Sequence, residues 1–380
     1  MSDIVRLRRE IHRHPERSGR EQKTAGRIES HLARLRPHSL MTGLGGFGLA
    51  AIFDSGSPGP TVLLRAELDA VPVQETAGRS YGSVVGNTSH SCGHDGHMAI
   101  LSALAEQLSL KRPARGRAVL LFQPAEENGS GAAAVLADPR FKTLSPDYAF
   151  ALHNLPGFSE GEVVIRSGPF SCASTGLVVR LRGKAAHAAQ PDTGRSPALP
   201  MCRIIEGLPR LGRGADGSAN FSMATVVYAR LGVTGAFGTA PESAEVMATL
   251  RSDTNQGLAD LVKRGIDLAG SAASAGAVGL EVDRRDEFPA TVNTEEGAVL
   301  VISAANRCGF GIHHLKKPFP WSEDFGHFTG RFGGALFGLG AGRAHPELHH
   351  PDYDFPETLI PKGCALFEAI LEQLLNEPDP

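Results

Sequence analysis

The sequence predicts an α/β protein with a mixed, mostly parallel sheet flanked by helices and a separate α+β segment inserted into it. Short apolar runs typical of buried strands alternate with helical segments in the first part of the chain. Longer, partly alternating runs begin near residue 170, and the first pattern returns near residue 292. With 380 residues, two domains are expected, one covering residues 1–170 and 290–380 and one covering residues 171–289.

The first region opens with two expected helices, because residues 3–35 carry apolar side chains at helical spacing that His14-Pro15 interrupts. Four β-type runs follow, separated by Gly/Pro turns or by a helical stretch at residues 97–110. These runs are residues 49–53, 61–66, 118–123 and 148–154.

The glycines of residues 43–48 match the G-x-G-x-x-G pattern of dinucleotide-binding loops. That fingerprint requires a helix after the glycines, whereas here a strand-like run follows them. A glycine-rich turn that enters a hairpin is therefore predicted.

The inserted segment combines long strands with helices. The expected strands are residues 177–183, 222–232 and 244–252, and the expected helices are residues 196–211 and 256–275. Apolar helix and strand patterns then resume at residues 297–309 and 334–340, and a well-patterned helix begins near residue 362. The tail is expected to return to the first domain.

The composition excludes several functional classes. With 38 basic and 41 acidic residues, the net charge of -3 favours neither a nucleic acid nor a membrane surface as a partner. No run of 18 apolar residues occurs, and the first residues lack the apolar core of a signal peptide. Five scattered cysteines are typical of a reducing compartment, so a cytoplasmic protein without a disulfide framework is expected.

Metal-capable side chains cluster within eight residues, at His90, Cys92, His94, Asp95 and His97. Thiolate and neutral imidazole are ligands suited to zinc or a related first-row metal. An aspartate beside a ligating histidine can fix the tautomer of that histidine. The alternative is a polar loop that precedes the helix.

Adjacent carboxylates, Glu126 and Glu127, follow the third β-type run, where the carboxyl end of a parallel strand meets the ligand-binding crevice. In an extended segment they would point to opposite sides, so that one could ligate a metal while the other faces a water. His153 also ends a strand, and His349 and His350 would join the others by folding back across the insert. The alternatives to a functional role are that the two glutamates are solvated at the surface and that His153 is structural.

Blocks of sequence over nearly the whole chain resemble the peptidase M20 amidohydrolases, in the branch of bacterial hippurate and N-acyl amino acid hydrolases and plant auxin-conjugate hydrolases. Their order and spacing agree with that family. The blocks are RREIHRHPERSGREQKTA (8–25), RAELDAVPVQE (65–75), SCGHDGHMA (91–99), FQPAEENGSGA (122–132), ALHNLPG (151–157), GKAAHAAQPDTGRSP (183–197), SEDFGHF (322–328) and LHHPDYDFPE (348–357).

The resemblance implies a catalytic metal-binding domain at residues 1–170 and 290–380 and a lid and dimerisation domain at residues 171–289. It also implies two divalent metal ions, zinc or manganese first and cobalt or nickel as alternatives. The implied ligands are Cys92, His94, Glu127, His153 and His349.

Three further roles are implied by the resemblance. Glu126 matches the general base, and Asp69 matches an acidic residue that orients a metal ligand. His187 matches a lid histidine that reaches the active site of a neighbouring subunit and stabilises the oxyanion. The expected protein is thus a homodimer that hydrolyses an N-acyl amino acid to a carboxylate and an amine.

Departures from the family pattern leave alternatives open. Glu67 stands where relatives usually have aspartate, and Gly238 where they often carry an asparagine that holds the substrate. A dipeptide or carbamoyl substrate and a catalytically idle relative therefore remain as alternatives. A thiol amidase, with Cys92 as a nucleophile activated by His94 or His97, is a separate alternative. The choice of His349 over His350 rests on alignment alone. Two acidic residues match a family element without an assigned role, Glu323 and Asp324.

Overall fold

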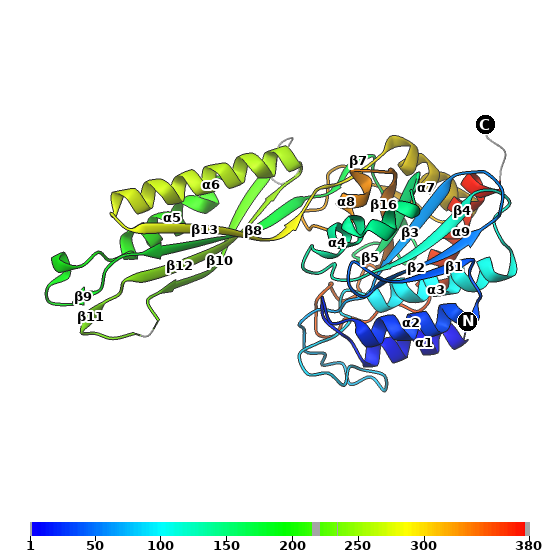
Figure 1. Ribbon diagram of the computed structural model, residues 1–380, viewed down its shortest axis with the longest axis horizontal. Coiled ribbons are helices and arrows are strands. Elements are labelled where there is room, and N and C mark those ends of the chain that lie inside the picture. Colours follow the sequence, from blue (N-terminus) through cyan, green and yellow to red (C-terminus); the bar gives the residue numbers. More distant parts are fainter. Residues whose placement is uncertain (1, 215–220, 234, 377–380) are drawn as a thin grey trace. The chain divides into compact units, whose positions relative to one another are not determined.

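The computed structural model describes residues 2–214, 221–233 and 235–376. They form two compact units (Figure 1). The first contains the residues up to Phe170, Thr291–Lys316 and the residues from Asp324 onward, and the second contains Ser171–Ala290 and Lys317–Glu323.

An eight-stranded sheet forms the centre of the first unit, in the order β1-β2-β4-β3-β5-β16-β6-β15. The four central strands, β4, β3, β5 and β16, are all parallel to one another. The pairs β1-β2, β2-β4 and β16-β6 are antiparallel. The predicted mixed sheet with a parallel centre is therefore confirmed. Its strands are β1 (Ser39–Leu44), β2 (Gly48–Asp54), β3 (Thr61–Glu67), β4 (Arg117–Gln123), β5 (Tyr148–Pro156), β6 (Val163–Ile165), β15 (Ile312–His314) and β16 (Gly333–Gly342).

The larger hydrophobic core joins alternate side chains of this sheet to the long helices of the first unit. The two helices expected at the start of the chain are present, with the break at Pro15, and the hairpin expected after the glycine-rich turn is β1-β2. The helices are α1 (Ser2–Arg13), α2 (Gln22–Arg34), α3 (His94–Leu110), α4 (Gly131–Ala137), α7 (Glu295–Arg307), α8 (Gly326–Thr329) and α9 (Leu359–Leu375), and a small sheet pairs β7 (Gly168–Ser171) with β14 (Thr291–Asn293).

The parallel centre brings the chemistry-bearing residues to one edge of the sheet. Because β3, β4 and β5 are parallel neighbours, the segments that follow their carboxyl ends meet there. The helix α3 begins at the same edge, after Gly93 in the left-handed conformation with φ of 91°. A Cβ at Gly93 would lie 2.3 Å from the Asn154 side chain, so glycine allows this close approach.

The second unit is an antiparallel sheet in the order β10-β12-β8-β13, packed against two helices by its own core. The three predicted strands and two predicted helices are present, whereas the mostly exposed, charge-rich β13 was not predicted. The elements are β8 (Ala173–Arg182), β10 (Ser222–Leu231), β12 (Ser243–Ser252), β13 (Gly279–Phe288), α5 (Ala198–Arg210), α6 (Asn255–Ala275) and the short pair β9 (Ala186–His187) and β11 (Thr239–Ala240).

Candidate metal centre

The five predicted ligands lie together in the first unit, in overlapping groups whose ligand atoms are all within 4.8 Å of one another. Cys92 belongs to two groups, one with His94 and His153 and one with Glu127 and His349. A third group joins His94 to Glu126 and Glu127. Segments almost 260 residues apart in the sequence, from Cys92 to His349, thus converge on one site.

Two histidines of the site have their tautomer fixed by backbone carbonyls. Nδ1 of His94 lies 2.9 Å from the carbonyl oxygen of Asp69, and Nδ1 of His153 lies 2.9 Å from that of Asn154. A carbonyl only accepts, so each Nδ1 donates, and the neutral ring then presents at Nε2 the unprotonated atom that a metal requires. Nε2 of His153 lies 3.5 Å from Sγ of Cys92, which places both donors on the same side of the site.

The structure distinguishes the two adjacent histidines of the C-terminal loop. Nε2 of His349 lies 3.7 Å from Oε1 of Glu127. His350 instead accepts a hydrogen bond at Nδ1 from the backbone N–H of Asp352 and is exposed. His349 itself has a left-handed backbone with φ of 63°, held by its N–H donating to the carbonyl of Ser91. The loop therefore directs His349 toward the other donors.

Glu126 and Glu127 occupy a turn, so the expectation of an extended segment is wrong. The turn at residues 126–129 is closed by the N–H of Gly129 donating to the carbonyl of Glu126 at 2.7 Å. Both carboxylates consequently reach the same neighbour, with distances of 3.9 and 3.7 Å from Nε2 of His94 to Glu126 and Glu127.

Asp69 supports the site in two ways. Its backbone carbonyl accepts from His94, and its side-chain Oδ2 accepts from the N–H of Glu127 at 2.9 Å and from the hydroxyl of Ser18 at 2.7 Å. Asp95, in contrast, faces away from the cluster toward Arg8 and His12. Asp69 thus contacts two of the predicted ligands directly.

A buried charge network beneath the site was missed by the sequence analysis. Arg65 on β3 pairs with Glu67 and, at 2.7 Å, with Asp324, and all three side chains are fully buried. Glu67 in turn accepts at 2.7 Å from Nδ1 of His97. Burial would raise the pKa of Glu67, but Arg65 and the histidines outweigh it and hold that pKa well below its ordinary value. The longer Glu67 side chain thus links β3 to α3.

The donor set fits divalent metal ions of the first transition row. Burial and the carboxylates of Glu127 and Glu126 raise the pKa of the Cys92 thiol well above its ordinary value. A thiolate here therefore requires compensating positive charge, which a cation supplies. One thiolate, imidazoles and carboxylates are the mixed ligation that zinc, manganese, cobalt or nickel accept.

In the second unit, His187 lies on β9 and is exposed. Its Nδ1 accepts from the N–H of Ala189 at 3.1 Å, and its backbone pairs with Thr239 on β11. The neighbouring Gly238 accepts from the N–H of Ala188, and a Cβ built there would meet no atom within 4 Å.

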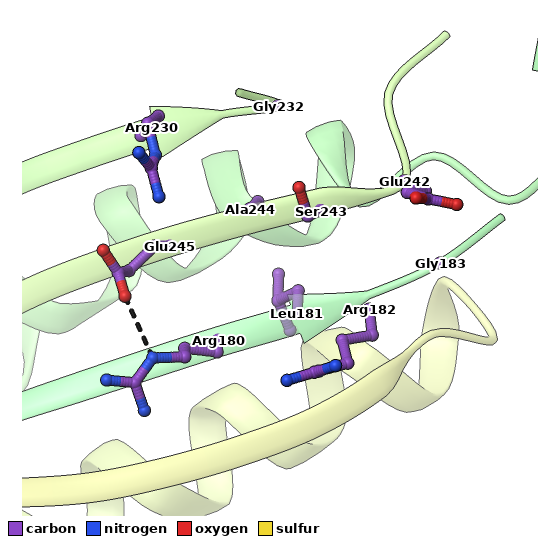
Figure 2. Close-up of a pocket in the computed structure, with 10 residues that line it drawn as sticks. All are labelled: Arg180, Leu181, Arg182, Gly183, Arg230, Gly232, Glu242, Ser243, Ala244 and Glu245. Carbon is purple, nitrogen blue, oxygen red and sulfur yellow. Dashed lines mark hydrogen bonds and ion pairs between the residues drawn. The ribbon is translucent and has the colours of Figure 1, made fainter. Parts of the chain in front are cut away.

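Figure 2 shows a different feature of the second unit, a surface pocket of about 490 Å³ at the ends of β8, β10 and β12. Arginines and glutamates line it without histidine or cysteine, and Arg180 pairs with Glu245 at 3.0 Å across it. The pocket therefore lacks the imidazole and thiolate donors that gather in the first unit.

Comparison with known proteins identifies the relatives of this chain. Residues 63–373 match Peptidase family M20/M25/M40. The chain belongs to this family. The M20 chain is 29% identical over 378 residues to the N-acetyl-L-cysteine deacetylase of Bacillus subtilis (strain 168), covering 98% of this chain and 88% of that protein. It is 25% identical over 378 residues to the hippurate hydrolase of Campylobacter jejuni, covering 98% and 97%.

The M20 fold is also found in solved structures. The YxeP protein of Bacillus subtilis, described as a dinuclear metal-binding peptidase of the M20 family, superposes with a TM-score of 0.82 at 24% identity, covering 99% of this chain and 98% of that one. The predicted family, fold class and assignment as a hydrolase of C–N bonds are confirmed. Among the described residues, no helix combines the length and apolar character needed to cross a membrane.

Proposed function

We propose that this M20 protein is a metal-dependent amidohydrolase that cleaves N-acyl amino acids to a carboxylate and a free amino acid. The observation that carries the proposal is the position of Glu126, whose carboxylate lies within 4.8 Å of ligand atoms of His94 and Glu127. A general base must lie within reach of the water that it deprotonates. The substrate class is carried over from the deacetylase and the hippurate hydrolase named above.

In this proposal two divalent ions, zinc or manganese first, are held by Cys92, His94, Glu127, His153 and His349. When bound, the ions supply Lewis acidity that activates a water and polarises the scissile carbonyl. Glu126 accepts the proton of the attacking water and returns it to the leaving nitrogen, which departs as a neutral amine. Only 6% of Glu126 is exposed, so its protonated form is shielded from bulk water between the two transfers.

The adjacent glutamates allow a matched test. Glu126→Gln should bind metal as the wild type does but lose roughly 10²–10⁴-fold in kcat, because the proton acceptor is gone. Glu127→Gln should instead lose bound metal, because a carboxylate ligand is gone. Metal content by atomic emission and amine release from N-acetyl, N-benzoyl and indole-acetyl amino acids would be measured for both.

The controls separate this proposal from its rivals. Activity lost on chelation and restored by manganese or zinc supports the proposal. The preferred substrate identifies the acyl group, which cannot be inferred at Gly238 because glycine has no side chain to contact the substrate and no atom lies within 4 Å of a Cβ built there. Near-normal turnover in Glu126→Gln would overturn the proposed base. Chelator-resistant activity abolished by alkylation would favour a nucleophilic Cys92, whereas metal binding without turnover on any substrate would favour an idle relative.

We further propose that the chain is a homodimer in which His187 stabilises the oxyanion in the active site of the neighbouring subunit. His187→Ala should lower kcat without loss of metal. Mixing this variant with Glu126→Gln should restore roughly a quarter of wild-type activity, because half of all dimers would be mixed and each mixed dimer would carry one intact site out of two. Subunit exchange would be verified with tagged chains. If activity is not restored after exchange, His187 does not act in the active site of the neighbouring subunit.

A further inference from the structure

Arg8 is a fully buried arginine on α1 that the proposed catalytic steps do not use. Its Nε lies 2.6 Å from Oδ2 of Asp95, and its Nη2 donates to Oδ1 of Asp354. A weaker contact of 3.4 Å joins Nη1 to Glu357. Burial alone would lower the pKa of Arg8, but Asp95 and Asp354 outweigh it and raise that pKa, so the guanidinium stays charged.

The two aspartates belong to segments that each carry a proposed metal ligand. Asp95 follows His94 in the first turn of α3. Asp354 lies five residues after His349, in the loop between β16 and α9. A single guanidinium therefore connects the helix that presents one ligand to the loop that presents another.

The loop depends on such contacts more than the helix does. His94 is held by the regular structure of α3 and by the carbonyl of Asp69. His349 lies outside any helix or strand, is half exposed at its side chain, and has a left-handed backbone. Loss of the Arg8–Asp354 pair should consequently displace the loop rather than the helix.

We propose that Arg8 is a positioning residue for the metal centre, which sets the distance of the His349 loop from His94 on α3. The inference rests on the proposed function, because it assumes that these side chains bind metal. Contacts that orient metal ligands typically change metal affinity by 10- to 100-fold when they are removed. Loss of Arg8 should lower the metal affinity of the group of Cys92, Glu127 and His349. The metal affinity of the group of Cys92, His94 and His153 should not change.

The chain offers a neighbouring control in Arg9. This residue makes a bidentate pair with Glu357, with both distances 2.8 Å, and is 45% exposed at its side chain. No described contact joins Arg9 to Asp95 or Asp354. Arg9→Ala thus removes an ion pair to the same loop region without breaking the connection to α3.

The experiment is calorimetric titration of the apo full-length chain with Mn²⁺ or Zn²⁺, using a competing chelator. Wild type and Arg9→Ala should show two sites of unchanged affinity. Arg8→Met should keep one site and weaken the other about 10- to 100-fold. Asp354→Asn, which is isosteric and keeps the Arg8–Asp95 pair, should do the same if Arg8→Met fails to fold.

The outcomes separate this inference from the proposed function. If the wild type binds no metal, the proposed function fails first. If the wild type binds two ions and the folded variant, verified by circular dichroism, binds both with wild-type affinity, the positioning role of Arg8 alone is overturned. Equal weakening of both sites would also overturn it, because it would indicate a general loss of structure.

Discussion

Arg65 in the first unit and Arg180 in the second both pair with two carboxylates, yet in different surroundings. Arg65 is fully buried with Glu67 and Asp324 beneath the metal centre. Arg180 lies on a sheet face, 26% exposed, and pairs at 3.0 Å with Glu245 and at 3.2 Å with Glu281. In the second unit, charges from adjacent strands face one another where water can solvate any member that loses its partner.

The difference shows what each set of charges can do. Buried charges are costly to leave unpaired, so each member of the Arg65 network is confined to one position. Exposed pairs are screened and each side chain can rotate away at little cost. The first unit therefore uses ion pairs to fix geometry near the metal centre, and the second uses them to cover a solvated sheet face.

The largest expected effect is the loss of Arg65. Arg65→Met should destabilise the first unit by about 3–5 kcal/mol, because Glu67 and Asp324 would remain buried without their cation. Arg180→Met, the matched change in the second unit, should cost less than about 1 kcal/mol. Urea unfolding of both apo variants would measure this, and equal losses would remove the contrast between the units.

A smaller effect is expected from the protonation of His12, which lies 1% exposed on α1. Burial lowers its pKa, but Asp95 and a hydrogen bond to Glu75 outweigh this and raise the pKa of His12 to about 9. Its stabilisation is therefore complete below the unfolded pKa near 6.5 and is lost as the pH rises through 9. The ionisable groups around it are Arg8, Glu75, Tyr81, His90 and Asp95.

The measurement is the difference in unfolding free energy between the wild type and His12→Gln, in chelator, from pH 6 to pH 10. The advantage of the wild type should fall by an amount on the order of 3 kcal/mol over this range. Subtracting the unfolding free energy of His12→Gln from that of the wild type removes the contribution of the other titrating groups. An advantage that stays constant with pH would show that His12 is not charged in the folded protein.

The smallest expected effect is the coupling between Arg180 and Glu245. A double-mutant cycle with Arg180→Met and Glu245→Gln should give a coupling of about 0.2–1 kcal/mol, decreasing with added salt. A coupling of several kcal/mol, insensitive to salt, would mean that this surface is covered in solution, for example by a second copy of the chain.

The sequence predicted the strands of the parallel centre and the residues that converge on the site. The strands could be predicted because buried strands are continuous apolar runs. Residue types alone indicated a cluster of metal-capable side chains, whereas the set of five ligands followed from the resemblance to the M20 family. Arg8 and Arg65 could not be predicted as buried, since an arginine in a helix or strand ordinarily lies on the surface. Their burial depends on Asp354 and Asp324, which only the folded chain brings near.

The turn at Glu126 and Glu127 shows a second limit. The apolar run before the pair predicts a strand that ends at Gln123, as β4 does, but it does not show which conformation the residues after the strand adopt. The strand β13 was missed for the opposite reason, because GLEVDRRDEF is an edge strand whose charges face solvent and which lacks an apolar run. The periodicity of apolar residues indicates which face of a strand is buried, so it gives no signal for a strand that is exposed.

The position of β16 in the sheet affects how the chain is synthesised. Strand β16 lies between β5 and β6, which are neighbours in sequence, although it follows them by more than 160 residues. During translation β5 and β6 therefore leave the ribosome before the strand that pairs with both of them. The whole second unit is synthesised, and can fold, before β16 follows. Pairing across such a separation is slow and leaves an open strand edge meanwhile. The nascent chain is thus most prone to aggregate in the interval before Gly342 leaves the ribosome.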